Sequence, residues 1–287
     1  MNNKWIIIDC SYVCHRAFHS MPGLQSGDVP TGVIFGFFKT LIALQERFRT
    51  TRLVFAFDSK GEGRRQKLLP TYKQVRHTQP LTDEETAARR LLYKQINDLR
   101  DKYLTQIGYR NVYHADGFEG DDVIASVCQN LPKGDTAVIV SADGDLYQLI
   151  SSRVSFYNPH KNVHYTPNTF KAAFGIASRD WWMVKALAGC STDEVPGIPK
   201  VGEKTAIKYL TGELKETSKI YAVIESTEGA QIWARNVPLV RLPFAGTPRF
   251  KPVTDVLDLL AWHKFVDKFG MSSIRDLSRV VQQLVFE

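Results

Sequence analysis

The chain has 287 residues and is 44% hydrophobic, which allows a sizeable core in one domain or two intergrown lobes and argues against disorder. Its formal net charge of +7 is compatible with a polyanionic partner without identifying one. The four cysteines form no CxxC pair, which argues against a disulfide framework or structural zinc. The start of the chain has only a short apolar run before Asp9, so we expect no signal peptide and no membrane span.

Three short apolar runs predict buried strands. They are KWIIID, which ends at Asp9, RLVFAFD, which ends at Asp58, and TAVIVSADGD, which ends at Asp143 and Asp145. Nearly continuous hydrophobicity is typical of strands covered on both faces of a parallel sheet, and helical patterns separate the runs. We therefore expect an α/β fold. Because ligands bind at the carboxyl ends of such strands, these carboxylates are expected to converge there.

An amphipathic helix is predicted in the segment ADGFEGDDVIASVCQNL, with Glu119, Asp121 and Asp122 at its start. Capping and the helix dipole also favour acidic residues in a first helical turn, so this cluster alone does not establish a site. The ADGD and DSKGEG segments are likewise ordinary turn and loop sequences. The recurrence of carboxylates at successive strand ends is what indicates a site.

A long insertion separates the predicted strands. Residues 61–110 contain a polar helical stretch from about Asp83 to Tyr103, and residues 60–80 carry six lysines or arginines against one acid. Long ordered insertions are commonly functional, although a solvated connection is the simpler alternative. From about Asn168 onward the pattern is helical. The segment from about Ser272 is amphipathic and is expected to pack on this second, helical lobe.

Carboxylates gathered at one sheet edge repel one another unless cations are bound or some groups are protonated. Oxygen ligands without convergent histidine or cysteine favour Mg²⁺ or Mn²⁺ over zinc. Beside a basic patch, such a site suits two-metal-ion hydrolysis of phosphodiesters. The chain has no GxSxG elbow, P-loop or GxGxxG turn, which argues against a serine hydrolase, an NTPase and a dinucleotide enzyme.

Five motifs occur in the order found in a known family. They are IIIDCSYVCHRAFHSMP, FAFDSKGEGRRQKLLPTYKQVR, GFEGDDVIASV, VSADGDLYQLI and DEVPGIPKVGEKTAIKYL. Together they resemble the motifs of the 5′ nucleases, which are structure-specific 5′–3′ exonucleases and flap endonucleases. These occur in bacteriophages, as free-standing bacterial proteins and as the amino-terminal domain of bacterial DNA polymerase I. The resemblance spans about residues 5–275.

The resemblance implies a fold with two parts. The first is a PIN-like, mostly parallel α/β core with a helical arch above an acidic cleft. The second is a helical lobe with a helix-three-turn-helix, or SAM-fold-like, element. We therefore expect a nuclease core at residues 1–167, with the arch at about 61–110, and a DNA-binding lobe at residues 168–287, with the helix-three-turn-helix at about 183–212.

The resemblance also assigns metal ligands and catalytic cations. The expected ligands are Asp9, Asp58, Glu119, Asp121 and Asp122 for the first ion, Asp143 and Asp145 between the ions or near the second, and Asp193 for the second. Lys73 and Arg76 match cations at the base of the arch that contact the scissile phosphate, where charge-assisted hydrogen bonds stabilise a developing dianion. We expect two Mg²⁺ ions, with Mn²⁺ as a substitute.

Contacts with DNA are implied for Arg16, Tyr72, Lys200, Gly202, Lys204 and Lys208. Tyr72 would stack on a terminal base or, as an alternative, pack as an ordinary aromatic side chain. Arg16 would lie near the substrate or form a surface ion pair. The segment VPGIPKVGEKTAIKYL resembles the family's turn between helices, which binds DNA phosphates through backbone amides and holds K⁺. Its lysines would follow the DNA backbone or form a solvated basic face.

The chain departs from the family pattern at three positions. The pattern before this turn is Gly-Asp-x-x-Asp-Asn, but residues 189–194 read Gly-Cys-Ser-Thr-Asp-Glu. The thiol of Cys190 is a poor ligand for Mg²⁺, so we expect a weak second ion unless Glu194 compensates. Lys200 replaces a glycine of the turn, which is expected to weaken the K⁺ site. Cys10 also stands where the family prefers glycine.

The sequence therefore predicts a Mg²⁺-dependent 5′ nuclease that leaves 5′-phosphate and 3′-hydroxyl ends during primer or flap removal in replication and repair. The expected partners are DNA with 5′ flaps, nicks or free 5′ ends, and RNA primers on DNA. We expect a monomer in the cytoplasm of a bacterial cell or phage-infected host, with no membrane association. Two alternatives stay open: a catalytically weak structure-specific DNA-binding protein of the same fold, and a PIN-type ribonuclease.

Overall fold

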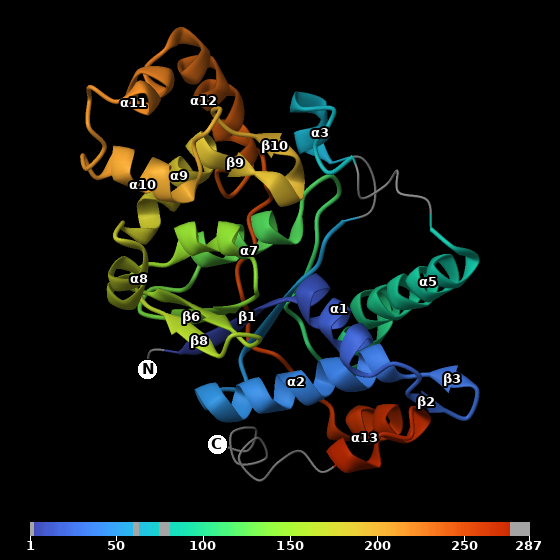
Figure 1. Ribbon diagram of the computed structural model, residues 1–287. Coiled ribbons are helices and arrows are strands. Elements are labelled where there is room, and N and C mark those ends of the chain that lie inside the picture. Colours follow the sequence, from blue (N-terminus) through green and yellow to red (C-terminus); the bar gives the residue numbers. More distant parts are fainter. Residues whose placement is uncertain (1–2, 60–62, 75–80, 276–287) are drawn as a thin grey trace.

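A six-stranded sheet forms the centre of the molecule (Figure 1). The computed structural model describes residues 3–59, 63–74 and 81–275. The strand order is β5-β4-β1-β6-β7-β8, in which β7 and β8 pair antiparallel and the other neighbours pair parallel. The strands are β1 (Lys4–Asp9), β4 (Leu53–Ala56), β5 (Val112–Tyr113), β6 (Thr136–Val140), β7 (Val154–Asn158) and β8 (Val163–Tyr165). The expected α/β class with a mostly parallel sheet is confirmed.

The continuous hydrophobicity of β1 reflects burial on both faces of the sheet. Ile6, Ile7 and Ile8 are all 0% exposed. Because successive side chains point to opposite faces, Ile6 and Ile8 belong to one core and Ile7 to the other. The covering helices are α1 (Cys10–Ser20) and α2 (Gly32–Phe48) on the first face and α7 (Gly120–Gln129) on the second. Two covered faces leave the ends of the strands as the place for a site.

The second part of the molecule, drawn in yellow to orange at the top of Figure 1, is helical. Its helices are α8 (Pro167–Phe174), α9 (Trp181–Ala188), α10 (Glu203–Leu210), α11 (Lys219–Ile224) and α12 (Thr227–Val240). A short antiparallel ribbon, β9 (Gly189–Cys190) with β10 (Val195–Pro196), follows α9. Trp181 and Leu187 are buried in the same core as Ile7. The helical lobe therefore shares a core with the sheet.

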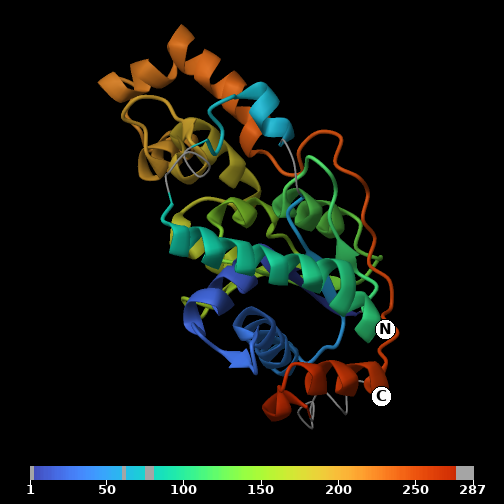
Figure 2. The same cartoon turned by 90° about the vertical axis from the view of Figure 1, so that its right-hand side faces the viewer.

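The insertion between β4 and β5 is largely helical. Helix α3 (Arg64–Leu68) begins it, and α5 (Asp83–Asp98) continues through the π-helical turn η1 (Leu99–Tyr103) into α6 (Leu104–Ile107). The N-terminus of α5 is closed by a capping box, in which the Thr82 hydroxyl accepts from the Glu85 amide at 3.1 Å and the Glu85 carboxylate accepts from the Thr82 amide at 2.8 Å. Helix α5 lies beside α1 (Figures 1 and 2).

Helix α13 (Leu259–Lys268) packs against α2 on the sheet core, and the chain reaches it along the edge strand β5. The ring of Phe38 lies 5.2 Å from that of Trp262 and 5.0 Å from that of Phe265. Ile274 joins the same core. The described residues of the segment from Ser272 pack on α13, where the Trp262 indole donates to the Arg275 carbonyl at 3.1 Å, and the rest of that segment lies outside the described residues. Its packing on the second lobe stays a prediction.

The proposed boundary between two domains at residue 167 stays a prediction. Residues 253 and 255 are tied back to β5, since Asn111 donates to the carbonyl of Val253 at 2.7 Å and the Asp255 carboxylate accepts from the Arg110 amide at 2.7 Å. These bonds cover an edge of the sheet that would otherwise expose unpaired backbone groups.

Within the described residues, no helix combines the length and apolar character needed to cross a bilayer.

Candidate metal-binding active site

The carboxylates at the strand ends line a single cleft of about 550 Å³. Six of the eight residues assigned to metal binding contribute to its wall: Asp9, Asp58, Glu119, Asp121, Asp143 and Asp145. They come from the end of β1, the loop after β4, the start of α7 and the loop after β6. Asp193 lies next to the cleft, 3.5 Å from the Lys73 ammonium in its wall, whereas Asp122 lies behind it. The expected convergence of carboxylates is therefore present.

Asp9 is fixed at the junction of β1 and α1. Its carboxylate caps α1 by accepting from the Tyr12 amide at 2.9 Å, and it accepts from the Ser141 hydroxyl at 2.7 Å. The pKa of Asp9 is raised to about 7, mainly by burial and to a smaller extent by the charges of Asp58 and Asp143, while the two hydrogen bonds oppose the shift. A bound cation would therefore favour the ionised form.

Asp58 is held between α1 and α7. Its carboxylate accepts from the Ser11 hydroxyl at 2.5 Å and from the Gly120 amide at 2.7 Å. A Cβ atom at residue 120 would lie 3.2 Å from Oδ1 of Asp58, the oxygen that accepts from the Gly120 amide, and this would be a tight contact. Glycine at this position therefore permits the close approach that fixes Asp58 in the cleft.

Two further carboxylates of the cleft, the half-buried Asp121 and the more exposed Asp143, repel one another. The pKa of Asp121 is raised well above its ordinary value, first by burial and then by the charges of Asp143 and Asp9. The pKa of Asp143 is raised to about 6, mainly by burial and by the charge of Asp145. Hard divalent cations relieve such repulsion, and a donor set dominated by carboxylate oxygens fits Mg²⁺ or Mn²⁺.

Without divalent ions, these carboxyl groups are expected to destabilise the protein as the pH rises from about 4 to about 7. The folded pKa of Asp9 exceeds its unfolded value of 3.8, so the folded state binds more protons in this window, and this contribution to the free energy of unfolding falls as the pH rises. Adding Mg²⁺ should therefore raise the Tm more at about pH 8 than at about pH 5. Thermal denaturation in EDTA and in Mg²⁺ tests this, and equal increases at both pH values would contradict it.

Asp122 is held in a buried ion pair behind the cleft. Its side chain is 0% exposed and accepts from both terminal nitrogens of Arg65, at 2.7 and 2.8 Å. It also accepts from the amide of Glu119 at 3.1 Å and the amide of Phe244 at 2.7 Å. These four donors use the accepting capacity of a carboxylate. In this structure the carboxylate of Asp122 anchors α3 to α7, and its assignment to the first metal ion stays a prediction.

Tyr72 and Lys73 lie at the base of the insertion. The Tyr72 side chain is 4% exposed, and its hydroxyl donates to Glu119 at 3.0 Å and to Asp193 at 3.3 Å. Its ring is buried, which favours the packing alternative over stacking on a base. The Lys73 ammonium lies 2.7 Å from Glu119 and lines the cleft. Burial opposes its charge, but Glu119 and Asp193 outweigh that effect, so the pKa of Lys73 is raised and the side chain stays cationic.

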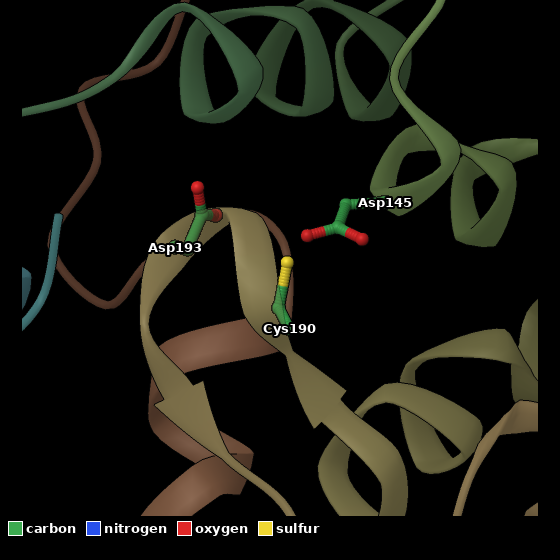
Figure 3. Close-up of side chains that lie close together, drawn as sticks. All are labelled: Asp145, Cys190 and Asp193. Carbon is green, nitrogen blue, oxygen red and sulfur yellow. The ribbon is translucent and has the colours of Figure 1, made fainter. Parts of the chain in front are cut away.

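A second group of side chains that could hold a metal ion lies next to the cleft. Asp145, Cys190 and Asp193 point toward one another (Figure 3), and one ligand atom from each lies within 4.8 Å of the others. Cys190 ends β9, Asp193 ends the short helical turn η4 (Ser191–Asp193), and Asp145 lies in the turn η2 (Gly144–Leu149). Burial, followed by the charges of Asp145 and Asp193, raises the pKa of Cys190 to about 11. Among the described residues, Glu194 is not a member of this group.

Lys185 is a cleft residue that the sequence motifs do not single out. Its ammonium lies 3.0 Å from Asp145 and 2.9 Å from Glu203. Burial opposes its charge, but the two carboxylates outweigh that effect and raise its pKa. The available signal was a lysine within the apolar helix WWMVKALA, because a charged residue on such a helix usually has a partner. The sequence around Ser141 and Arg65 contains no comparable pattern that would predict their hydrogen bonds to Asp9 and Asp122.

The turn expected to contact DNA connects β10 to α10. Lys204 and Lys208 are exposed on α10, and Gly202 precedes its first residue without a capping side chain. Lys200 is exposed and has a φ of 65°, in the left-handed region that favours glycine. The turn thus keeps the backbone conformation of a glycine position. The DNA and K⁺ contacts of these residues stay predictions.

Replacing Lys200 by glycine is expected to stabilise the fold by about 1 kcal/mol, because a side chain at positive φ costs roughly that amount. Lys204→Gly is the matched control, since it also removes an exposed lysine but at a helical position, where it should destabilise by about 1 kcal/mol. Urea denaturation measures both changes. A lower stability for Lys200→Gly would show that the left-handed conformation is not strained.

Two residues assigned from sequence lie away from the cleft or outside the described residues. Arg16 is exposed on α1 and lines a separate groove with Lys39 and Arg47 of α2. It is not among the residues that line the carboxylate cleft. Arg76 lies outside the described residues, so its catalytic role stays a prediction.

Comparisons with known proteins agree on one family. Residues 4–175 match the family model described as the 5′–3′ exonuclease, N-terminal resolvase-like domain. A 5′–3′ exonuclease of Buchnera aphidicola subsp. Schizaphis graminum is 32% identical over 226 residues, which cover 78% of this chain and 75% of that protein. A thermostable DNA polymerase I of Thermus thermophilus is 30% identical over 207 residues, which cover 71% of this chain and 23% of that protein.

The fold is also that of a solved phage nuclease. A structure of the bacteriophage T5 flap endonuclease in a complex with DNA and metal ions aligns with a TM-score of 0.70 at 18% identity, covering 98% of this chain and 100% of that chain. The family match, the relatives and the carboxylate cleft at the strand ends all agree with the resemblance found in the motifs. The chain belongs to the 5′–3′ exonuclease family of 5′ nucleases.

Proposed function

We propose that this protein is a Mg²⁺-dependent, structure-specific 5′ nuclease that hydrolyses DNA phosphodiesters near 5′ ends, with Mn²⁺ as a substitute. The observation that carries the proposal is the cleft in which carboxylates from separate strand ends meet beside the Lys73 ammonium. The related Buchnera protein is named a 5′–3′ exonuclease, and the T5 structure contains DNA and metal ions. Both names are consistent with this activity.

Asp9, Asp58, Glu119 and Asp121 of the cleft, with Asp122 behind it, would hold the first ion or orient its ligands. Asp143 would lie between the ions or near the second. When bound, divalent ions lower the pKa of a water molecule that they coordinate toward neutrality, and they stabilise negative charge on a phosphate. Ser141 and Ser11 hold two of the carboxylates in place by hydrogen bonds. The protein thereby fixes a set of oxygen ligands in advance, which lowers the reorganisation required for reaction.

Lys73 would contact the scissile phosphate, with Arg76 in the same role by its place in the motif. The Lys73 ammonium lies in the cleft wall and is held by Glu119, so it is positioned before DNA binds. A lysine in this position favours the extra negative charge that develops on the phosphate during attack. The exposed lysines of the turn, Lys200, Lys204 and Lys208, would contact the DNA backbone without reading its sequence.

Replacing Lys73 by alanine is expected to lower kcat about 100-fold with a much smaller change in KM, since the lysine acts mainly on charge that develops in the transition state. Lys67→Ala is the matched control, because Lys67 is an exposed lysine on α3 that does not line the cleft. Steady-state kinetics on a 5′-flap substrate measure both variants. Equal losses in kcat and in affinity would make Lys73 a general phosphate contact.

The expected partners are DNA with 5′ flaps, nicks or free 5′ ends, and RNA primers on DNA. The protein would bind them as a monomer, in the cytoplasm of a bacterial cell or phage-infected host. A panel of one 5′-flap duplex, one nicked duplex and one single-stranded RNA, each labelled and incubated with Mg²⁺, tests the substrate class. Preferred cutting of the flap supports the proposal. Preferred cutting of RNA would favour a PIN-type ribonuclease, and flap binding without cutting would favour a structure-specific DNA-binding protein.

A further inference from the structure

Several charged side chains surround the group formed by Asp145, Cys190 and Asp193. Lys73 lies between Glu119 and Asp193, at 2.7 and 3.5 Å. Lys185 lies between Asp145 and Glu203, at 3.0 and 2.9 Å. Glu119 also lies 3.4 Å from Arg65. Carboxylates and cations are therefore interleaved around the ligand atoms of Asp145 and Asp193.

The sulfur of Cys190 is held where it faces these carboxylates. Cys190 pairs with Val195 across the β9–β10 ribbon and is 7% exposed. The ribbon is tightly packed, since a Cβ atom at Gly189 would lie 2.3 Å from the carbonyl oxygen of Val195. The Thr192 hydroxyl lies 3.0 Å from the sulfur and would donate to it once the thiol loses its proton. A ligand fixed by its backbone and by a neighbouring donor is suited to hold a metal ion.

We propose that Cys190, Asp145 and Asp193 form a mixed sulfur–oxygen site that selects transition-metal ions such as Zn²⁺ and Co²⁺ over Mg²⁺. The inference rests on the proposed function, because the site lies beside the metal-binding cleft. Thiolate sulfur binds Zn²⁺ and Co²⁺ well, whereas Mg²⁺ prefers carboxylate oxygen and water as ligands. As the sulfur–metal bond forms, the thiol proton leaves to the solvent, so one proton is released for each ion bound and no electron is transferred.

The consequence is a nuclease whose two metal positions differ in preference. The cleft around Asp9 and Asp121 offers oxygen ligands for Mg²⁺, and the neighbouring position offers sulfur. Because the two positions lie side by side, the metal ion at the second would influence cleavage. The activity would then depend on a trace transition metal as well as on Mg²⁺.

A Co²⁺ titration followed by absorbance tests this directly, because sulfur-to-cobalt charge transfer gives a near-ultraviolet band that oxygen ligands lack. The wild type is expected to show the band at one equivalent of Co²⁺, with loss of the band when Zn²⁺ is added. Cys190→Ser should lose the band and bind Zn²⁺ roughly tenfold or more weakly by calorimetry. Cys190→Asp should also lose the band and bind Mg²⁺ more tightly at the second position. Cys128→Ser is the control, since Cys128 is a buried cysteine elsewhere in the core and its loss should leave the band unchanged.

A wild-type protein without the band, or a band that persists in Cys190→Ser, would overturn the inference. Flap cleavage by the same wild-type sample in Mg²⁺ is measured alongside. Cleavage without a cobalt band would refute the sulfur site and leave the nuclease function standing. A cobalt band without cleavage in any metal would refute the nuclease function and leave the metal site. Circular dichroism of each variant shows that it is folded.

Discussion

Replacing Asp121 by asparagine is expected to lower the cleavage rate by about 1,000-fold, equivalent to about 4 kcal/mol of transition-state stabilisation. Asp121 lines the cleft at the start of α7, where its neighbours Asp9 and Asp143 carry like charges. An amide of the same shape retains the packing but is a much weaker ligand for a hard cation. DNA binding should be nearly unchanged, because binding depends on the basic surfaces outside the cleft.

Single-turnover cleavage of a 5′-labelled flap, together with a binding assay on the same substrate, measures the effect of Asp121→Asn. The matched control is Asp116→Asn, since Asp116 is an exposed acid four positions before Gly120 that does not line the cleft. That variant should keep the wild-type rate. If Asp121→Asn cleaves at nearly the wild-type rate, Asp121 is not a metal ligand and the site assignment fails.

Replacing Asp122 by alanine is expected to act on stability, lowering the free energy of unfolding by about 3 to 5 kcal/mol. The variant removes the two short bonds that Arg65, which is 4% exposed, makes to Asp122, leaves it only the longer 3.4 Å contact with Glu119, and leaves the Phe244 amide without its Asp122 acceptor. Breaking a buried ion pair by removing one partner is among the largest single destabilising changes. Two adjacent aspartates of one motif are therefore expected to differ in kind, the first in catalysis and the second in stability.

Urea denaturation measures the effect of Asp122→Ala. The control is Asp116→Ala at an exposed position, whose free energy of unfolding should stay within about 0.5 kcal/mol of the wild type. A double variant, Arg65→Met with Asp122→Leu, should be more stable than Asp122→Ala, because it removes both charges and fills the space with apolar atoms. A loss below about 1 kcal/mol for Asp122→Ala would mean that the ion pair contributes little and that Asp122 is free for another role.

The sheet and most of the cleft could be predicted from sequence because their signals are local. Continuous apolar runs such as KWIIID predict strands buried on both faces, and an aspartate at the end of each run predicts where the carboxylates meet. The five motifs placed the family, and comparison confirmed it. The left-handed φ of Lys200 likewise agrees with the glycine expected at that position of the turn.

The sequence is less informative where a side chain's environment is set by distant residues. Asp121 and Asp122 are neighbours in one motif, but successive residues of a helix point about 100° apart, and the partner of Asp122 is Arg65, 57 residues away. The burial of Tyr72 depends on its packing with α9 and α12 in the helical lobe. An amphipathic face also does not specify its partner, so the sequence alone could not place α13 against α2 on the sheet core.

The most direct test of the central claim is the cleavage of a 5′-labelled flap duplex, measured with Mg²⁺ or Mn²⁺ and with EDTA as the control. The account predicts cutting near the junction, with 5′-phosphate and 3′-hydroxyl ends, that stops when EDTA removes the ions. Tight binding of the flap without cleavage at any Mg²⁺ or Mn²⁺ concentration would contradict it and would leave a structure-specific DNA-binding protein as the function.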